Sequence, residues 1–334
     1  MKQNNKMKEI LTSNQMIIVY IIVALSCAIG MKNPAFADFS TIITLSRALL
    51  VTLIFAICEM VVIISGGIDV SFPAVACAAL YIPVVVMKEH DMNSALLAFV
   101  MAAGIGLIVG IINGFLIAVL KLPPLIATLG VSSIVSGMVL TFFGTNEISR
   151  MPKAIKGLGE VFLFTYTNKN DITYSMTVFI IVPIVLCIAV HLILKYTMLG
   201  RGIYAIGGDK NAARIAGFNV VRLQFIVYIF SGVFAGIAGM IYCILCSSAN
   251  PLNLMGSEMM VIAAVVIGGT RITGGHGGVI GTVLGVVLIA LIQNNLIMLG
   301  VPAYWQTFVV GAVIIVGTAI TSLKAKAIAN SPKV

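Results

Sequence analysis

Residues 223–246 read LQFIVYIFSGVFAGIAGMIYCILC, a stretch without a lysine, arginine, aspartate or glutamate. A helix needs about 20 consecutive apolar residues to cross the hydrocarbon core of a bilayer, and this run is long enough to do so. The whole chain shares this character, because 60% of its 334 residues are hydrophobic and only 9% are charged. A soluble domain has roughly 25% charged residues. The sequence therefore predicts an integral membrane protein of the all-α, polytopic class.

Further apolar runs lie on both sides of this one. Clear runs occupy residues 15–30, 48–64, 94–120, 124–143, 176–195, 278–298 and 303–322, and two shorter ones, 72–87 and 258–269, are flanked by glycine clusters. The shorter runs are expected to be short, broken or partly re-entrant helices. We therefore predict about ten transmembrane helices in a single domain over residues 1–334. The 32 glycines fit this fold, because small residues let membrane helices approach closely.

The basic residues predict the orientation, because cytoplasmic loops collect Lys and Arg. Lys2, Lys6 and Lys8 precede the first run, which we interpret as a retained helix and not a cleaved signal peptide. With ten crossings, both termini and the segment 196–222 are cytoplasmic. Residues 144–175 form an extracytoplasmic loop, although this loop also carries basic residues. The net charge is +9, but the basic residues lie at the ends of apolar runs, which argues against a nucleic-acid partner.

The sequence has no visible catalytic or metal-binding constellation. It contains three histidines, no clustered acids and no Ser/His/Asp arrangement. All six cysteines fall inside apolar runs, and the pair Cys243 and Cys246 has no second pair or histidine at zinc spacing. We therefore expect buried thiols, no metal site and no enzyme.

A faint internal similarity indicates two related halves. Residues 106–124 and 281–302 each open with G-x-x-x-G, continue as an apolar run and end next to proline. In the ten-helix arrangement the two stretches run in opposite directions. This is the pattern of a weak inverted repeat, which in transporters places the solute path between the halves.

The patch AIGGDKNAARIAGFNV at residues 205–220 is unusual in a chain so poor in charge. Gly207 and Gly208 are expected to end the preceding element, Asp209 to cap a short helix, and Gly217 to close it. A two-turn helix is not stable alone in water, so either the protein's own helix ends or a partner's groove must hold it. The alternative is a solvated turn, but the alanines of this patch favour close docking.

Polar side chains within the apolar runs are candidates for lining a solute path. Thr128, Ser132 and Ser136 repeat every four residues and so share one face of a helix over 124–143. Such hydroxyls can instead bond back to their own helix, and small faces also pack helices together. The amide side chains within or at the ends of spans are Asn113, Gln293, Asn294 and Asn295.

Asp69 stands out among the acidic residues. It lies in SGGIDVS at 65–71, where polar backbone interrupts an apolar region. A membrane protein tolerates this only when the segment is buried in protein or lines a wet cavity. Asp69 is therefore part of a gate or path wall, or else the N-cap of the helix that begins at residue 72. Glu59 and His191 are further ionisable residues within spans, positions that by default indicate function.

Three stretches resemble the permease subunits of ribose-type ABC importers, in the branched-chain amino acid/ribose permease superfamily. Residues 200–220, GRGIYAIGGDKNAARIAGFNV, resemble the cytoplasmic coupling segment of that family, with Asp209 where Asn is usual and Phe218 where Ile is usual. SGGIDVS resembles the stretch after the family's second helix, although Phe72 and Pro73 follow where a glycine is expected. VVIGGTRITGGHGGVIGT at 265–282 is similar to a Gly-rich family motif. The order and spacing agree over about residues 15–325.

This resemblance implies the permease subunit of an importer for a monosaccharide or sugar-like solute in the bacterial inner (cytoplasmic) membrane. The implied partners are a cytoplasmic ABC ATPase, an extracytoplasmic solute-binding protein, a second permease subunit, identical or related, and membrane lipid. No G-x-x-x-x-G-K-[ST] motif occurs, so ATP and Mg²⁺ are expected on the ATPase and no cofactor on this chain. The residues that would couple to the ATPase are Gly207, Gly208, Asp209, Asn211, Ala212, Ala213, Arg214, Ala216 and Gly217.

The expected solute path contains Asp69, Asn113, Thr128, Ser132, Ser136, Gln293 and Asn294. One alternative remains open at this stage. A self-contained secondary transporter, driven by protons or sodium, would use Glu59, Asp69 and His191 as its relay, but it leaves the patch at 205–220 without a role.

Overall fold

The computed structural model describes residues 14–168 and 170–295, together with isolated positions between 298 and 315. Its α-helices are α2 (Asn14–Lys32), α3 (Phe39–Ile64), α4 (Phe72–Glu89), α5 (Ala95–Gly114), α6 (Pro124–Phe142), α7 (Lys153–Gly159), α8 (Ile181–Tyr196), α9 (Met198–Gly208), α10 (Lys210–Ile215), α11 (Val220–Cys246), α12 (Glu258–Ile267) and α13 (Val279–Asn295). Three short helices, η1 (Pro34–Ala37), η2 (Phe115–Val119, a π-helix) and η3 (Val178–Ile180), and the strands β1 (Phe162–Thr167) and β2 (Thr173–Thr177) complete the described chain.

The predicted all-α, polytopic class is confirmed. Seven of the described helical segments are long and apolar enough to cross a membrane, and α12 and α13 are shorter apolar helices. These helices correspond to every predicted run except 303–322, which lies outside the continuously described residues. Of the two runs expected to be short, broken or partly re-entrant, 258–269 is a short helix, α12, with 10 residues. The run 72–87 is not broken, because α4 is continuous and the glycines at 66 and 67 interrupt the chain before it.

Polar residues set where several helices begin. Asp38 caps α3 by accepting from the Ser40 amide at 2.8 Å, and Asn219 caps α11 by accepting from the Arg222 amide at 2.9 Å. Each cap satisfies one of the backbone donors that a helix start leaves without an internal partner. The starts of these two spans are therefore defined by side chains that sequence reasoning can recognise.

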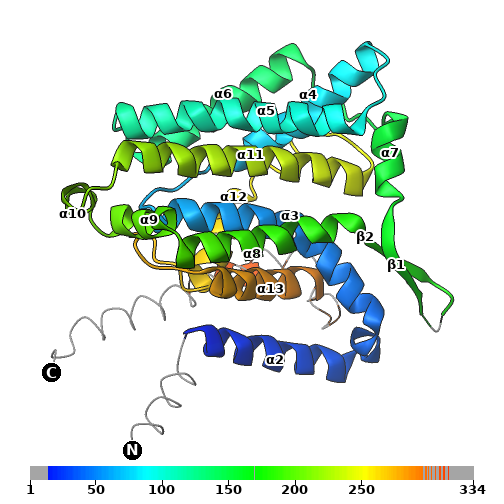
Figure 1. The fold of residues 1–334 in the computed structure, drawn as a ribbon. Helices are drawn as coiled ribbons and strands as arrows, with labels where there is room; N and C mark the ends of the chain where they lie inside the picture. Colours follow the sequence, from blue (N-terminus) through cyan, green and yellow to red (C-terminus); the bar gives the residue numbers. More distant parts are fainter. Residues whose placement is uncertain are drawn as a thin grey trace, which may run out of the picture.

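The long helices lie side by side, and the non-spanning elements gather at their two ends (Figure 1). The short helix α10 lies at one end, next to α9, while α7 and the β1–β2 hairpin lie at the opposite end. Helix α2 starts at the α10 end of the molecule. The predicted loop 144–175 therefore contains α7 and most of an antiparallel hairpin that the sequence did not predict, and it is separated from α10 by the length of the helices.

Helix α11 is central to the packing, because it contacts α3, α4 and α5. Its contact with α5 is backbone against backbone. A β-carbon on Gly106 would overlap the Gly232 carbonyl, and a β-carbon on Gly232 would overlap the Gly106 carbonyl. Only glycine permits this approach, as expected for small residues at membrane helix crossings. The buried core formed around this crossing includes Tyr228 and Ala235 of α11.

Candidate functional site

The predicted short helix in the 205–220 patch exists. Asp209 has an extended backbone, with φ −153° and ψ 115°, and its Oδ1 accepts from the Asn211 amide at 2.7 Å and the Ala212 amide at 3.0 Å. Helix α10 follows and ends before Gly217, whose φ of +88° is the left-handed conformation that favours glycine after a helix. The N-cap role predicted for Asp209 and the helix-closing role predicted for Gly217 are therefore confirmed.

Helix α10 turns one side toward its own protein and the other side outward. Ala213 is only 2% exposed and packs with Ile206 of α9 and with Val220 and Leu223 of α11. Ile215 comes two residues later, on the opposite side of the helix, and is 89% exposed. Of the predicted coupling residues, Gly207 is buried as well, whereas the other seven, Gly208, Asp209, Asn211, Ala212, Arg214, Ala216 and Gly217, are exposed. Helix α10 is thus packed against α9 and α11 through Ala213, and the apolar side chain of Ile215 is exposed on its outer side.

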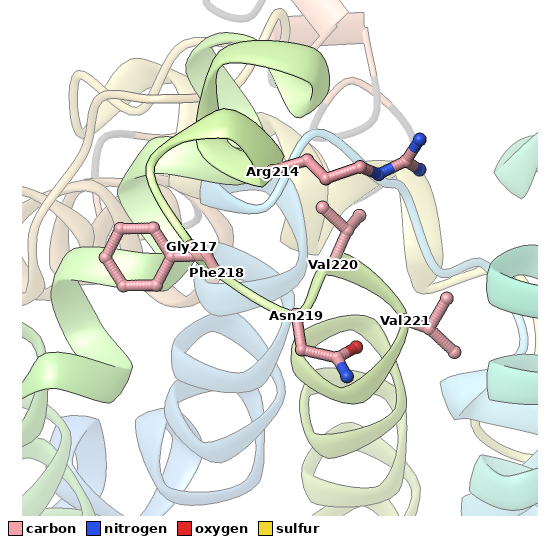
Figure 2. Close-up of a pocket in the computed structure, with 6 residues that line it drawn as sticks. All are labelled: Arg214, Gly217, Phe218, Asn219, Val220 and Val221. Atoms are coloured by element: carbon pink, nitrogen blue, oxygen red, sulfur yellow. The ribbon is translucent and has the colours of Figure 1, made fainter.

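A hollow of about 320 Å³ lies where α10 meets α11 (Figure 2). Its lining residues are Arg214, Gly217, Phe218, Asn219, Val220 and Val221. The Arg214 side chain extends over Val220 and Val221, and the Phe218 ring points away on the other side of the backbone (Figure 2). The surface around α10 therefore combines a cation, an exposed isoleucine and a shallow hollow.

A second group of functional candidates lies inside the protein, around the segment 65–71. Both oxygens of Asp69 are occupied: Oδ1 accepts from the Ser71 amide at 2.8 Å and the Ser71 hydroxyl at 2.6 Å, and Oδ2 accepts from the Ser231 hydroxyl at 3.0 Å. Glu59 Oε1 accepts from the Asp69 amide at 3.2 Å. Asn113 donates to the Ser71 hydroxyl at 2.8 Å. We name Glu59, Asp69, Ser71, Asn113, Thr128 and Ser231 the buried polar cluster.

Thr128 connects this cluster to α6. Its hydroxyl accepts from the Val70 amide at 3.2 Å and lies 2.9 Å from the Pro124 carbonyl of its own helix. The cluster therefore joins α3, α5, α6 and α11 to the segment that precedes α4. The N-cap position of α4 is Ser71, which makes no side-chain capping bond, so Asp69 is not the N-cap. The Asp69 carboxylate instead organises the turn before the helix.

Three polar atoms in this region have no hydrogen-bond partner among the described residues. They are Glu59 Oε2, Asn113 Oδ1 and the Tyr228 hydroxyl. All three belong to buried residues, and the Tyr228 hydroxyl lies so close to Gly67 that a β-carbon there would overlap it. Buried polar groups normally have partners, so this cluster has unused capacity to bind water or another polar group.

The structure brings together only some of the predicted path residues. Asp69, Asn113 and Thr128 meet in the cluster, and Ser132 is buried one turn along α6 from Thr128. Ser136 lies farther along this face and contacts the Met255 sulfur at 3.6 Å. The remaining two belong to α13: Gln293 lies 2.6 Å from the Met260 sulfur, and Asn294 bonds to the Ala290 carbonyl of its own helix.

Sequence reasoning missed three contributors to this site. Ser71 and Ser231 complete the Asp69 hydrogen bonds, and Tyr228 adds a buried hydroxyl. Ser231 could have been found as a polar residue in the middle of a long apolar run. Tyr228 could not, because tyrosine inside a span usually packs as an aromatic residue. All six cysteines are free thiols, but only Cys58, Cys77 and Cys243 are buried as predicted. Cys187 is half-buried, and the prediction is wrong for Cys27 and Cys246, which are exposed.

Comparison with known proteins agrees with this architecture. The profile of the family described as "Branched-chain amino acid transport system / permease component" matches residues 41–317. A probable ABC transporter permease protein of Sinorhizobium fredii is 32% identical over 92% of this chain and 88% of its own length. The fructose import permease protein of Bifidobacterium longum is 34% identical over 79% of this chain and 77% of its own. The ribose import permease protein of Bacillus subtilis is 31% identical over 89% of this chain and 89% of its own length.

No solved structure matches the chain. The family profile covers most of the sequence, and the relatives align over nearly their full lengths. The resemblance seen in the three sequence motifs is therefore confirmed. The chain is a multi-pass membrane protein that belongs to the family of branched-chain amino acid transport system permease components.

Proposed function

We propose that this chain is the transmembrane permease subunit of an ATP-driven ABC importer for a monosaccharide or sugar-like solute, located in the bacterial inner membrane. The observation that carries the proposal is the exposed Ile215 on a helix that the protein holds in place through Ala213. A large apolar side chain that is 89% exposed beyond the spans gains nothing from water or lipid there. It fits the groove of a cytoplasmic partner. The name of the Sinorhizobium fredii relative, a probable ABC transporter permease protein, supports an ABC transporter, and the name of the ribose import permease protein supports import of a sugar.

The partner at this surface is an ABC ATPase, which binds ATP and Mg²⁺ in place of this chain. It docks on the 205–220 segment within the cytoplasmic region 196–222, with Ile215 in an apolar groove and Arg214 beside it. Nucleotide-driven closure of the ATPase dimer moves α10, and the spans respond by alternating access. The extracytoplasmic loop 144–175, with α7 and the hairpin, faces a solute-binding protein. A second permease subunit, identical or related, completes the assembly in the lipid bilayer.

The arrangement of the spans fits ten crossings and an inverted repeat. If residues 106–124 correspond to 281–302, then α3, α4 and α5 correspond to α11, α12 and α13. If the two halves are related in this way, every contact in one half should have a counterpart in which each helix is replaced by its corresponding helix. The α5–α11 contact should then have the counterpart α13–α3, and both contacts occur. The α4–α5 contact should likewise have the counterpart α12–α13, and both of these occur as well. The proposed tenth span is the run 303–322, which lies outside the continuously described residues.

The solute passes between the two halves, along polar side chains. Asp69, Asn113 and Thr128 belong to this path together with Ser132 and Ser136 on the same face of α6. Gln293 and Asn294 contribute from α13. Neutral amides and hydroxyls bind a sugar weakly enough to release it. The ion-coupled alternative is not favoured, because Glu59 and Asp69 lie together while His191 of α8 is not among the residues bonded to them.

The docking surface can be tested with a single exposed side chain. Ile215→Glu places a charge where the proposal needs an apolar contact, and burying an unpaired charge is costly. We expect the variant to bind a co-expressed ABC ATPase at least about ten-fold more weakly, as for other interface hot spots. The measurement is the amount of ATPase that co-purifies with the detergent-solubilised chain.

The matched control is Ile172→Glu, because Ile172 is another exposed isoleucine, 51% accessible, in the hairpin turn at the opposite end. This variant should retain the ATPase. Equal co-purification by Ile215→Glu and the control would show that α10 is not the docking surface.

A further inference from the structure

The three motifs that identify the family meet in space at the end of the molecule near α10. Gly66 of the first motif, Gly207 of the second, and Gly274 and Gly275 of the third lie in direct backbone contact, and we name these four residues the glycine junction. A β-carbon on Gly207 would overlap the Ile64 carbonyl and lie 2.6 Å from the Gly275 nitrogen. A β-carbon on Gly274 would lie 2.7 Å from the Gly207 carbonyl oxygen and 2.9 Å from the Gly66 α-carbon.

Hydrogen bonds fasten the same three segments. The Gly275 amide donates to the Ile64 carbonyl, the last residue of α3, at 2.9 Å. The Tyr204 hydroxyl of α9 donates to the Gly277 carbonyl at 2.8 Å. Gly66, Gly274 and Gly275 also have positive φ values of 81°, 87° and 69°. Helix α9 therefore contacts both the segment before α4 and the loop before α13, with no side chain in between.

The junction lies between the outer helix and the buried polar cluster. On one side, Ala213 of α10 packs on Ile206, which is the neighbour of Gly207 in α9. On the other side, Gly66 is followed within the same segment by Asp69, which bonds to Ser231 of α11. A continuous series of contacts thus runs from α10 to the middle of the spans.

We propose that the glycine junction transmits movement of α10 to the segment 65–71, and through that segment to the buried polar cluster. This inference deepens the proposed function and rests on it. Side chains at such a contact could absorb a small displacement by changing rotamer, but closely packed backbone cannot. A shift of α9 must therefore move Ile64 and Gly66 with it. Asp69 then changes its position relative to Ser231 and Asn113, and this change opens or closes the path.

Two glycines provide a matched test. Gly207→Ala forces the junction apart, whereas an added β-carbon on Gly278, three residues after Gly275 in the loop before α13, meets no atom within 4 Å. In proteoliposomes that contain the ATPase and the binding protein, Gly207→Ala should lower solute uptake by about ten-fold, an ordinary coupling energy. ATPase co-purification should be unchanged, because Gly207 is buried and cannot touch the ATPase, and Gly278→Ala should transport like the unmodified protein. Normal uptake by a folded Gly207→Ala protein would overturn the proposal.

One further variant decides the matter if Gly207→Ala does not fold. Tyr204→Phe removes only the bond to Gly277 and should reduce uptake several-fold at unchanged melting temperature. Uptake that is unaffected by Tyr204→Phe would contradict a junction that moves as one body. Absence of ATPase from the unmodified complex would instead refute the proposed function.

Discussion

Replacing Gly106 with alanine is expected to destabilise the protein by about 1–3 kcal/mol, the usual effect of overpacking a tightly packed contact. The added methyl group meets the Gly232 carbonyl and comes within 3.0 Å of the Val233 α-carbon. All of these atoms belong to the backbone of α11, so no rotamer change can relieve the overlap. The helices must separate, and the contacts of α11 with α4 and α5 weaken together. The measurement is the melting temperature in detergent, which should fall.

Gly104 is the matched control for this prediction. It lies in the same helix, two residues earlier, and a β-carbon there meets no atom within 4 Å. Gly104→Ala should therefore leave the melting temperature unchanged or raise it, because alanine favours a helix over glycine by about 1 kcal/mol. If Gly106→Ala and Gly104→Ala had the same melting temperature, the backbone contact between α5 and α11 would be contradicted.

Asp69→Ala is expected to destabilise the protein by an amount comparable to that of Gly106→Ala. The carboxylate accepts from the Ser71 amide, the Ser71 hydroxyl and the Ser231 hydroxyl, and all of these groups are buried. Each buried donor that loses its acceptor costs about 1–3 kcal/mol. The segment 65–71 should therefore loosen, and amide hydrogen exchange at its residues should accelerate more than elsewhere in the protein.

Asp69→Asn distinguishes hydrogen bonding from charge. The amide keeps one acceptor for the Ser71 backbone and offers a donor to Ser231, whose hydroxyl can accept. This variant should keep most of the stability that Asp69→Ala loses. If the amide hydrogens of the segment 65–71 exchanged in the Asp69→Ala variant at the same rate as in the unmodified protein, the carboxylate would have no organising role. If the Asn variant were as unstable as the Ala variant, the charge itself would be required.

Much of the fold could be predicted from the sequence, because a bilayer permits few alternatives. Long apolar runs had to become helices, and the runs at 223–246 and 48–64 did so as α11 and α3. The cap at Asp209 and the glycine closure at Gly217 were predictable for another reason, because both depend on local backbone chemistry.

Contacts between distant segments could not be predicted. Nothing in SGGIDVS indicates that Gly66 touches Gly207, or that Asp69 bonds to Ser231, because these contacts depend on how the helices pack. The direction of side chains on α10 was also beyond the sequence pattern. The small residues of this patch appeared to be the docking face, but Ala213 faces inward and Ile215 is the exposed apolar residue.

The most direct test of the whole account is solute uptake into proteoliposomes that contain the purified chain with or without its ABC ATPase. Ribose and fructose are suitable labelled solutes, because two relatives are named as import permeases for them, and each is presented with a solute-binding protein that binds it. We expect accumulation of at least one solute only when both the ATPase and ATP are present. Accumulation by the chain alone, driven by a proton or sodium gradient, would contradict the account and make Glu59 and Asp69 the centre of an ion-coupled transporter.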